Sequence, residues 1–169
     1  MKPIVSIIMG STSDLPVMEK AAKFFDEMEI PFEINALSAH RTPDAVEEFA
    51  KGAKERGIKV IIAGAGMAAA LPGVIAASTT LPVIGVPVKG SVLDGVDAVY
   101  SMLQMPPGIP VATVAINGAL NAGILAVQML ALSDEALAEK FVAYKSGLRQ
   151  KIEKANAELK EVKFAYKCN

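Results

Sequence analysis

Short runs of apolar, largely β-branched residues recur along the chain, separated by stretches with helical spacing. These runs cover residues 4–9, 31–37, 60–64, 82–88 and 111–116. Most of these runs are apolar almost without interruption, whereas apolar and polar residues alternate in the run 31–37. Near-continuous apolar strands with helices between them are typical of a parallel sheet that is covered on both faces. Right-handed crossovers then predict a three-layer α/β/α domain.

Helices are predicted in the intervening segments 13–28, 42–57, 71–78 and 118–131. In the second of these, Thr42 is the expected N-cap and Pro43 the first helical residue. Gly57 is the stop signal at its end. Ligands of parallel sheets bind at the carboxyl ends of the strands, so we expect the functional residues in the loops that follow each strand.

The last predicted segment, about 133–162, is one long amphipathic helix. Its apolar stripe consists of Leu137, Phe141, Tyr144, Leu148, Ile152, Ala155, Leu159 and Val162. Thirty helical residues would span roughly 45 Å, which exceeds the width of a domain of this size. Two alternatives follow: the helix breaks near Gly147, or its stripe packs on another subunit. We expect residues 1–169 to form a single domain whose last helix packs on a neighbour.

Composition narrows the class of protein. The chain has 17 basic and 18 acidic residues, which offers no electrostatic basis for binding nucleic acid or a membrane surface. The first apolar run is too short for a signal peptide or a membrane span, so a cytoplasmic protein is expected. The single cysteine, Cys168, is the next-to-last residue. The chain contains no cluster of Cys and His residues, so the sequence does not predict a zinc or iron–sulfur site.

The first polar cluster is "GSTSD" at 10–14. Ser11 and Ser13 offer hydroxyl groups, and the following helix start offers free N–H groups to an anion. Asp14 could accept hydrogen bonds from sugar hydroxyls. The structural alternative is capping of that helix by Ser13 or Asp14. The cluster is neither a Walker loop nor GxGxxG.

The second cluster is "LSAHRTP" at 37–43, and it holds the only histidine of the chain, His40. Any chemistry that needs an imidazole near neutral pH must therefore use this loop. Arg41 could bind a phosphate beside the first loop. The alternative is that His40 is a surface residue without a role.

The third cluster is "AGAGMAAALPG" at 63–73. Its small residues would let a ligand approach the backbone closely, or they serve close packing of helix on sheet. A fourth candidate, "QMPPG" at 104–108, contains Met105 and is either a cover for the site or a turn. From the residues alone, the chain is an α/β protein that binds a phosphorylated small molecule.

Six motifs occur in an order and spacing that resemble a known family: "MGSTSD", "SAHRTP", "AGAGMAAALPG", "PVIGVPV", "QMPPGIPVATVAI" and "NAGILAVQML". Over about residues 3–132 the chain resembles the N5-carboxyaminoimidazole ribonucleotide mutases of bacterial purine biosynthesis. The resemblance implies a flavodoxin-like subunit, a homo-octamer in which the last helix reaches over a neighbour, and neither a metal nor an organic cofactor.

The resemblance also implies a reaction and a set of residues. A carboxylate moves from the exocyclic nitrogen of an aminoimidazole ribonucleotide to ring carbon C4, on the route to IMP, and His40 is the implied acid and base. Phosphate and ribose contacts map onto Ser11, Ser13, Asp14 and Arg41. Ser38, Ala39, Ala65, Gly66, Met67, Ala68 and Leu71 complete the expected substrate-binding set.

One position departs from the family pattern. Relatives carry His in "AAHLPG", where this chain has Ala70. A second imidazole is therefore absent, and the proton chemistry falls on His40. We expect backbone amides around 65–69, aided by Ser38, to bind the migrating carboxylate.

Two rival functions remain at this stage. Related carboxylases use free carbon dioxide and carry an "AGRSN"-like segment, whereas "AGAG" at 63–66 favours the mutase. The second rival is a non-catalytic flavodoxin-like nucleotide sensor, but the chain has no acidic phosphoacceptor constellation at the strand ends and no aromatic residues suited to flank a flavin. Turnover with each substrate separates the three functions.

Overall fold

The structure is a computed structural model that describes all 169 residues as two compact units, residues 1–130 and 131–169, which we describe separately. The first unit contains five strands: β1 (Val5–Met9), β2 (Phe32–Ala36), β3 (Val60–Gly66), β4 (Val83–Val88) and β5 (Ala112–Thr113). All neighbouring pairs are parallel, and the strand order is β2-β1-β3-β4-β5. This order is that of flavodoxin-like doubly wound sheets, so the predicted fold is confirmed.

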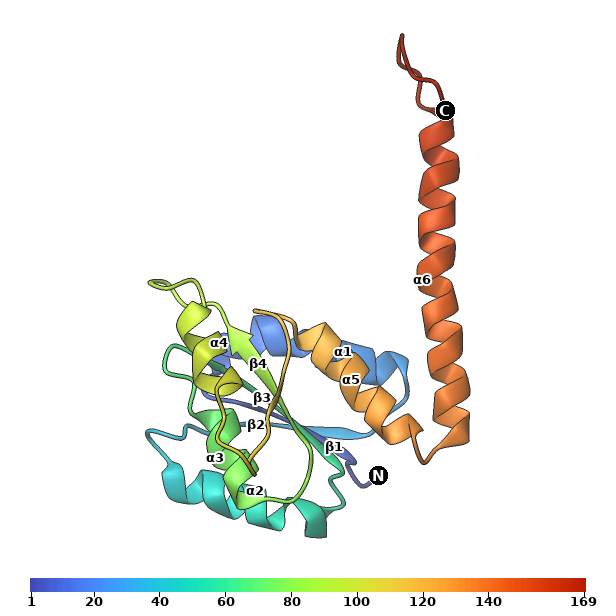
Figure 1. Cartoon of the computed structure of the whole chain (residues 1–169). Coiled ribbons are helices and arrows are strands. Elements are labelled where there is room, and N and C mark those ends of the chain that lie inside the picture. Colours follow the sequence, from blue (N-terminus) through green and yellow to red (C-terminus); the bar gives the residue numbers. More distant parts are fainter. The chain divides into compact units, whose positions relative to one another are not determined.

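Helices cover both faces of this sheet (Figure 1). They are α1 (Leu15–Glu27), α2 (Pro43–Arg56), α3 (Leu71–Ser78), α4 (Val96–Leu103) and α5 (Ala119–Ala131), with a short 3-10 turn, η1 (Thr12–Asp14), before α1. On one face α5 packs closely on α1, since a Cβ on Gly123 would lie 3.4 Å from the Ala21 Cα. On the other face α2, α3 and α4 share one buried apolar cluster that includes Val46, Ile75 and Met102.

The sequence predicted most of these elements and missed one. α2 begins at Pro43 after the N-cap Thr42 and ends at Gly57, which has a φ of 98°, as expected. α4 was not predicted, and its N-cap residue, Gly95, offers no capping side chain that would signal its start. β5 is shorter than the predicted 111–116, because the chain leaves the sheet edge for a turn at Asn117, where φ is 58°.

Close packing at Gly64 fixes the position of α1 over the centre of the sheet. A Cβ on Gly64 would lie 2.4 Å from the sulfur of Met18, which is fully buried on α1. The same glycine accepts a backbone hydrogen bond at 3.2 Å from the N–H of Gly10, just beyond the end of β1. The absence of a side chain at Gly64 therefore brings the loop after β1 against β3.

The second unit consists mainly of α6 (Glu135–Glu161), followed by a short tail. Asp134 caps this helix by accepting from the N–H of Leu137 at 3.0 Å. The helix runs through Gly147 without interruption for 27 residues, or about 40 Å. Of the two alternatives read from the sequence, the break near Gly147 is therefore excluded.

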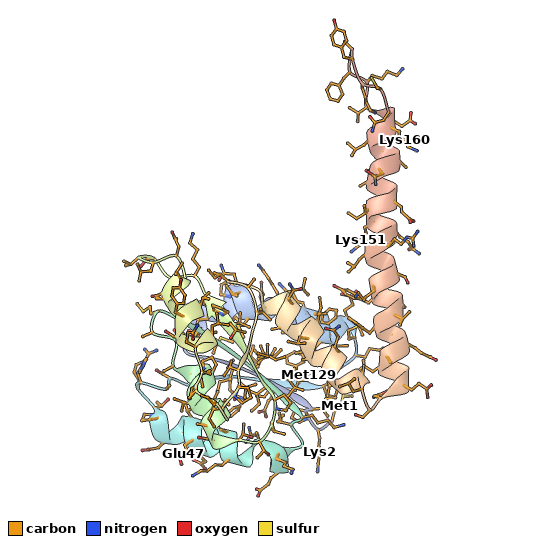
Figure 2. All side chains as sticks on the ribbon, viewed as in Figure 1. Met1, Lys2, Glu47, Met129, Lys151 and Lys160 are labelled. Carbon is orange, nitrogen blue, oxygen red and sulfur yellow. The ribbon has the colours of Figure 1, made fainter.

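Side chains project from α6 along its whole length, Lys151 and Lys160 among them (Figure 2). Leu148, Ile152 and Leu159 are exposed by 41%, 65% and 59% in the isolated chain. The apolar stripe read from the sequence is thus present: Leu137 is buried, Phe141 and Tyr144 are partly exposed, and from Leu148 onward the stripe faces solvent. None of the helices, α6 included, combines the length and the apolar character that crossing a membrane requires.

Candidate active site

A cavity of about 600 Å³ lies at the carboxyl ends of β1, β2, β3 and β4. Parallel strands present their carboxyl ends at one edge, so the loops that follow them meet there. Every residue that the sequence predicted for the site lines this cavity: Ser11, Ser13, Asp14, Ser38, Ala39, His40, Arg41, Ala65, Gly66, Met67, Ala68 and Leu71. The three predicted clusters are therefore one site.

The loop after β1 forms the first part of the cavity. The hydroxyl oxygen of Ser11 accepts from the N–H of Ser13 at 3.3 Å and caps the turn η1. Asp14 makes no side-chain capping bond to α1. Asp14 thus occupies the N-cap position of α1 without a capping bond from its side chain, and its carboxyl group lines the cavity.

Partial burial raises the pKa of the Asp14 carboxyl group above its ordinary value. Hydrogen bonds from Ser11 and Ser13 act in the opposite direction and are the weaker influence. The cavity thus keeps an acidic side chain in partly desolvated surroundings, where hydrogen-bond donors of a ligand, such as sugar hydroxyls, would relieve the cost.

The loop between β2 and α2 is held by its own side chains. Thr42 Oγ1 donates to the carbonyl oxygen of Ser38 at 3.0 Å and accepts from the Ser38 N–H at 3.0 Å. The N-cap residue Thr42 thus braces the loop rather than capping the helix with its side chain. His40 lies in the turn that these bonds close.

Arg41 joins this loop to the loop after β1. Its Nη2 donates to the carbonyl oxygen of Gly10 at 3.1 Å, and its Nε donates to the Ser38 hydroxyl at 3.3 Å. The Ser38 hydroxyl also accepts from the Arg41 backbone N–H at 3.2 Å. These bonds hold the guanidinium in one orientation, so its remaining N–H groups point in fixed directions. A planar donor group held in this way can bind the oxygens of a phosphate.

His40 is adjacent to this arginine, is exposed to solvent and lines the same cavity. It is the only imidazole of the chain. The structure therefore places one group that can exchange protons near neutral pH beside one fixed cation.

The loop between β3 and α3 forms the opposite wall and carries no charged side chain. Met67 has a φ of 56°, a left-handed conformation that is unusual outside glycine. The amides of Ala69 and Ala70 donate within the loop, to Met67 at 2.9 Å and to Ala68 at 2.7 Å. Of the expected carboxylate donors, the Ala69 amide is thus occupied, whereas the Ala68 amide has no partner among the hydrogen bonds of the loop.

Sequence reasoning missed the contribution of β4. Val88, Lys89 and Gly90 also line the cavity. The signal was present, because these residues end the fourth predicted strand and should have been read like the ends of the first three. Lys89 is the one lysine among the lining residues.

The segment 104–108 does not line this cavity. Met105 packs instead against α3, where a Cβ on Gly73 would lie 3.3 Å from its sulfur. Within one chain Met105 therefore fills space behind the site. No three His, Cys, Asp or Glu side chains are grouped in a way that could hold a metal ion.

Comparisons with known proteins agree with this arrangement. The AIR carboxylase family matches residues 4–151. The chain is 57% identical over 150 residues to the N5-carboxyaminoimidazole ribonucleotide mutase of Thermotoga maritima, which covers 89% of this chain and 88% of that protein. It is 53% identical over 161 residues to the phosphoribosylaminoimidazole carboxylase of Candida glabrata, covering 95% of this chain and 28% of that protein.

A solved structure of PurE from Treponema denticola superposes on the chain with a TM-score of 0.84, at 32% identity, covering 94% of this chain and 99% of the other. The chain belongs to the AIR carboxylase family.

Proposed function

We propose that this protein is an N5-carboxyaminoimidazole ribonucleotide mutase of purine biosynthesis. It moves the carboxylate of its substrate from the exocyclic nitrogen to ring carbon C4, and the product continues toward IMP. One observation carries the proposal: the only imidazole, His40, shares a cavity with the fixed guanidinium of Arg41 at the carboxyl edge of the sheet. The identity to the Thermotoga maritima mutase supports it.

The phosphate of the nucleotide binds at the wall formed by the first two loops. Arg41 supplies the positive charge, and the hydroxyls of Ser11 and Ser13 together with the start of α1 supply donors. Asp14 accepts from the ribose hydroxyls. With the phosphate anchored in this way, the base extends toward His40 and the loop after β3.

His40 then performs two proton transfers. It protonates the exocyclic nitrogen as the carbon–nitrogen bond of the carbamate breaks, which releases carbon dioxide and the free amine. The electron-rich ring attacks carbon dioxide through C4, and the carbon–carbon bond forms. His40 removes the C4 proton, which restores aromaticity and the protonated imidazole. One imidazole suits both steps, because this type of side chain can both donate and accept a proton in general acid–base catalysis.

The wall between β3 and α3 retains the carbon dioxide. Carbon dioxide is small and apolar, and Ala65, Ala68 and Ala69 give it an apolar surface close to C4. Held there, it reacts at a high effective concentration and does not escape to water. The family histidine is absent at Ala70, so the amides of Met67 and Ala68, with Ser38, bind the charged carboxylate before and after the transfer.

A carboxylase that takes free carbon dioxide is the second candidate, favoured by the identity to the Candida glabrata enzyme. Purified protein distinguishes the two. We expect rapid turnover of N5-carboxyaminoimidazole ribonucleotide, and slow carboxylation of aminoimidazole ribonucleotide at ambient bicarbonate. Faster turnover of the second substrate would overturn the mutase proposal.

We also propose that the chain assembles into a homo-octamer, with α6 packing on a neighbouring subunit. Its exposed apolar stripe supports this, and so does the exposed apolar face of α4, where Val96, Tyr100 and Leu103 are 47%, 63% and 52% exposed. Sedimentation velocity should give the mass of eight chains. The double variant Leu148→Glu and Ile152→Glu should have a lower mass. An unchanged mass would exclude a role for α6 in the assembly.

The cytoplasm is the proposed location. The substrate carries a phosphate and a carboxylate, so it is retained where nucleotide precursors are made. Fractionation of the source cells should recover the activity with the cytoplasmic enzymes, and recovery with the membrane fraction would contradict this.

A further inference from the structure

The cavity contains a second cation that the proposed chemistry has not used. Lys89 follows β4 directly, and its Nζ lies 3.0 Å from Asp94 Oδ1. The side chains of Lys89 and Asp94 are 58% and 74% exposed. An ion pair this exposed contributes little to stability, so an anionic ligand can replace Asp94 at low cost.

Lys89 and Arg41 stand at opposite ends of the cavity. Arg41 follows β2 and Lys89 follows β4, and β1 and β3 lie between them in the sheet. Three strand spacings separate their strands by about 14 Å. A nucleotide whose phosphate binds Arg41 therefore extends its base, not its phosphate, toward Lys89.

Lys89 adjoins the loop after β3, which we assigned to the carboxylate. A Cβ on Gly66 would lie 3.1 Å from the carbonyl oxygen of Val88, and a Cβ on Gly90 would lie 4.0 Å from Met67 Cγ. Met67, Ala68 and the Lys89 side chain thus border the same end of the cavity.

The backbone of Lys89 is fixed although its side chain is free to move. Asn117 Oδ1 accepts from the Lys89 N–H at 2.9 Å, and the Asn117 N–H donates to the Pro87 carbonyl at 2.8 Å. The ammonium can therefore change partner by rotation of its own flexible stem, without movement of the cavity wall.

We propose that Lys89 exchanges Asp94 for the carboxylate on the base of the nucleotide and thereby selects carboxylated over uncarboxylated aminoimidazole ribonucleotides. The proposal rests on the proposed function, because it takes its ligand from it. It adds a cation to the two amides of Met67 and Ala68, and it gives the site one positive charge for each anionic end of the ligand.

The test compares two ligands that differ only in the carboxylate, 4-carboxy-5-aminoimidazole ribonucleotide and 5-aminoimidazole ribonucleotide. Their affinities for the full chain are measured by isothermal titration calorimetry. In Lys89→Met the carboxylated ligand should bind about tenfold more weakly, as expected for loss of one charge-assisted hydrogen bond. The uncarboxylated ligand should change less than about twofold, because it never reaches this charge.

Three further variants give the controls. Lys89→Arg should restore affinity for the carboxylated ligand to within about threefold, since the charge returns. Asp94→Asn should bind that ligand at least as tightly as the unmodified chain, because the competing anion is gone. Lys59→Met, at the opposite end of β3, should change neither affinity.

Equal weakening of both ligands in Lys89→Met, or no weakening, would overturn the proposal. Weaker binding of the carboxylated ligand to Asp94→Asn would overturn it as well. Failure of the proposed function gives a different result. The unmodified chain would then bind neither nucleotide or, if it is a carboxylase, would bind both and turn over aminoimidazole ribonucleotide with bicarbonate faster than the carbamate.

Discussion

The two walls of the cavity are built by opposite means. Side-chain hydrogen bonds hold the wall after β2, where Ser38, Arg41 and Thr42 are tied to one another and to Gly10. The wall after β3 has alanines in place of polar side chains, and backbone conformation shapes it, including the left-handed φ of 56° at Met67.

This difference corresponds to what each wall binds in the proposed reaction. The phosphate keeps its charge and place throughout, so a rigid polar wall suits it. The migrating group is charged in substrate and product but neutral and apolar as carbon dioxide, and a wall of backbone and methyl groups accommodates both states. Substitutions should therefore affect chemistry, phosphate binding and stability to different extents according to their wall.

The largest effect is expected at His40, which lies on the polar wall but acts on the base. His40→Asn should lower kcat by about 10³-fold, because both proton transfers lose their group. Nucleotide affinity should stay within about threefold, because Asn keeps much of the polar character at that position. Steady-state kinetics and calorimetry on the same preparation measure both, and near-normal turnover would refute the assignment.

Arg41 should produce the next largest effect, confined to the phosphate. Arg41→Ala should weaken binding of aminoimidazole ribonucleotide about 100-fold, through loss of a charge-assisted, directed contact. Arg41→Lys should recover only part of this, since a point charge lacks the planar donor geometry. The dephosphorylated nucleoside serves as control, and an equal loss for that ligand would place Arg41 elsewhere in recognition.

Substitutions in the alanine-rich wall after β3 should change the free energy of unfolding. Met67→Gly should raise the free energy of unfolding by about 0.5–1 kcal/mol, because glycine adopts positive φ without the strain of a side chain. Met67→Ala should give no such gain, because alanine keeps the strain. Urea denaturation of the three proteins checks this, and a loss of stability in Met67→Gly would show that the Met67 side chain contributes more than its conformation costs.

Asp14 should give the smallest effect, and it should depend on pH. Burial raises the pKa of Asp14 in the folded chain, so the folded state is stabilised by protonation relative to the unfolded state and loses that advantage as pH rises. Asp14→Asn removes the charge, and it should stabilise the chain by about 0.5 kcal/mol or less at pH 7.

This gain in stability should vanish when the pH falls below 3.8, the ordinary pKa of an Asp side chain. There the carboxyl group is neutral in both the folded and the unfolded state. Urea denaturation at the two pH values tests the sign. A gain that is larger in acid than at pH 7 would contradict the assigned direction of the pKa shift.

The sequence predicted the strand ends and hence the position of the cavity, because the apolar runs and their periodicity are local signals. The sequence could not show which hydroxyl of the first loop acts as a cap, since capping by Ser11 depends on the geometry of the turn. It missed α4, which lacks an N-terminal signal, and it missed Lys89, although the end of the fourth predicted strand marked that position.

A crystal structure of the chain with 4-carboxy-5-aminoimidazole ribonucleotide bound tests the central claim most directly. The account predicts an imidazole nitrogen of His40 within about 3.2 Å of the exocyclic nitrogen or C4, or joined to it by one water, with the phosphate on Arg41. An imidazole that faces away from the base, beyond the reach of a single bridging water, would contradict it.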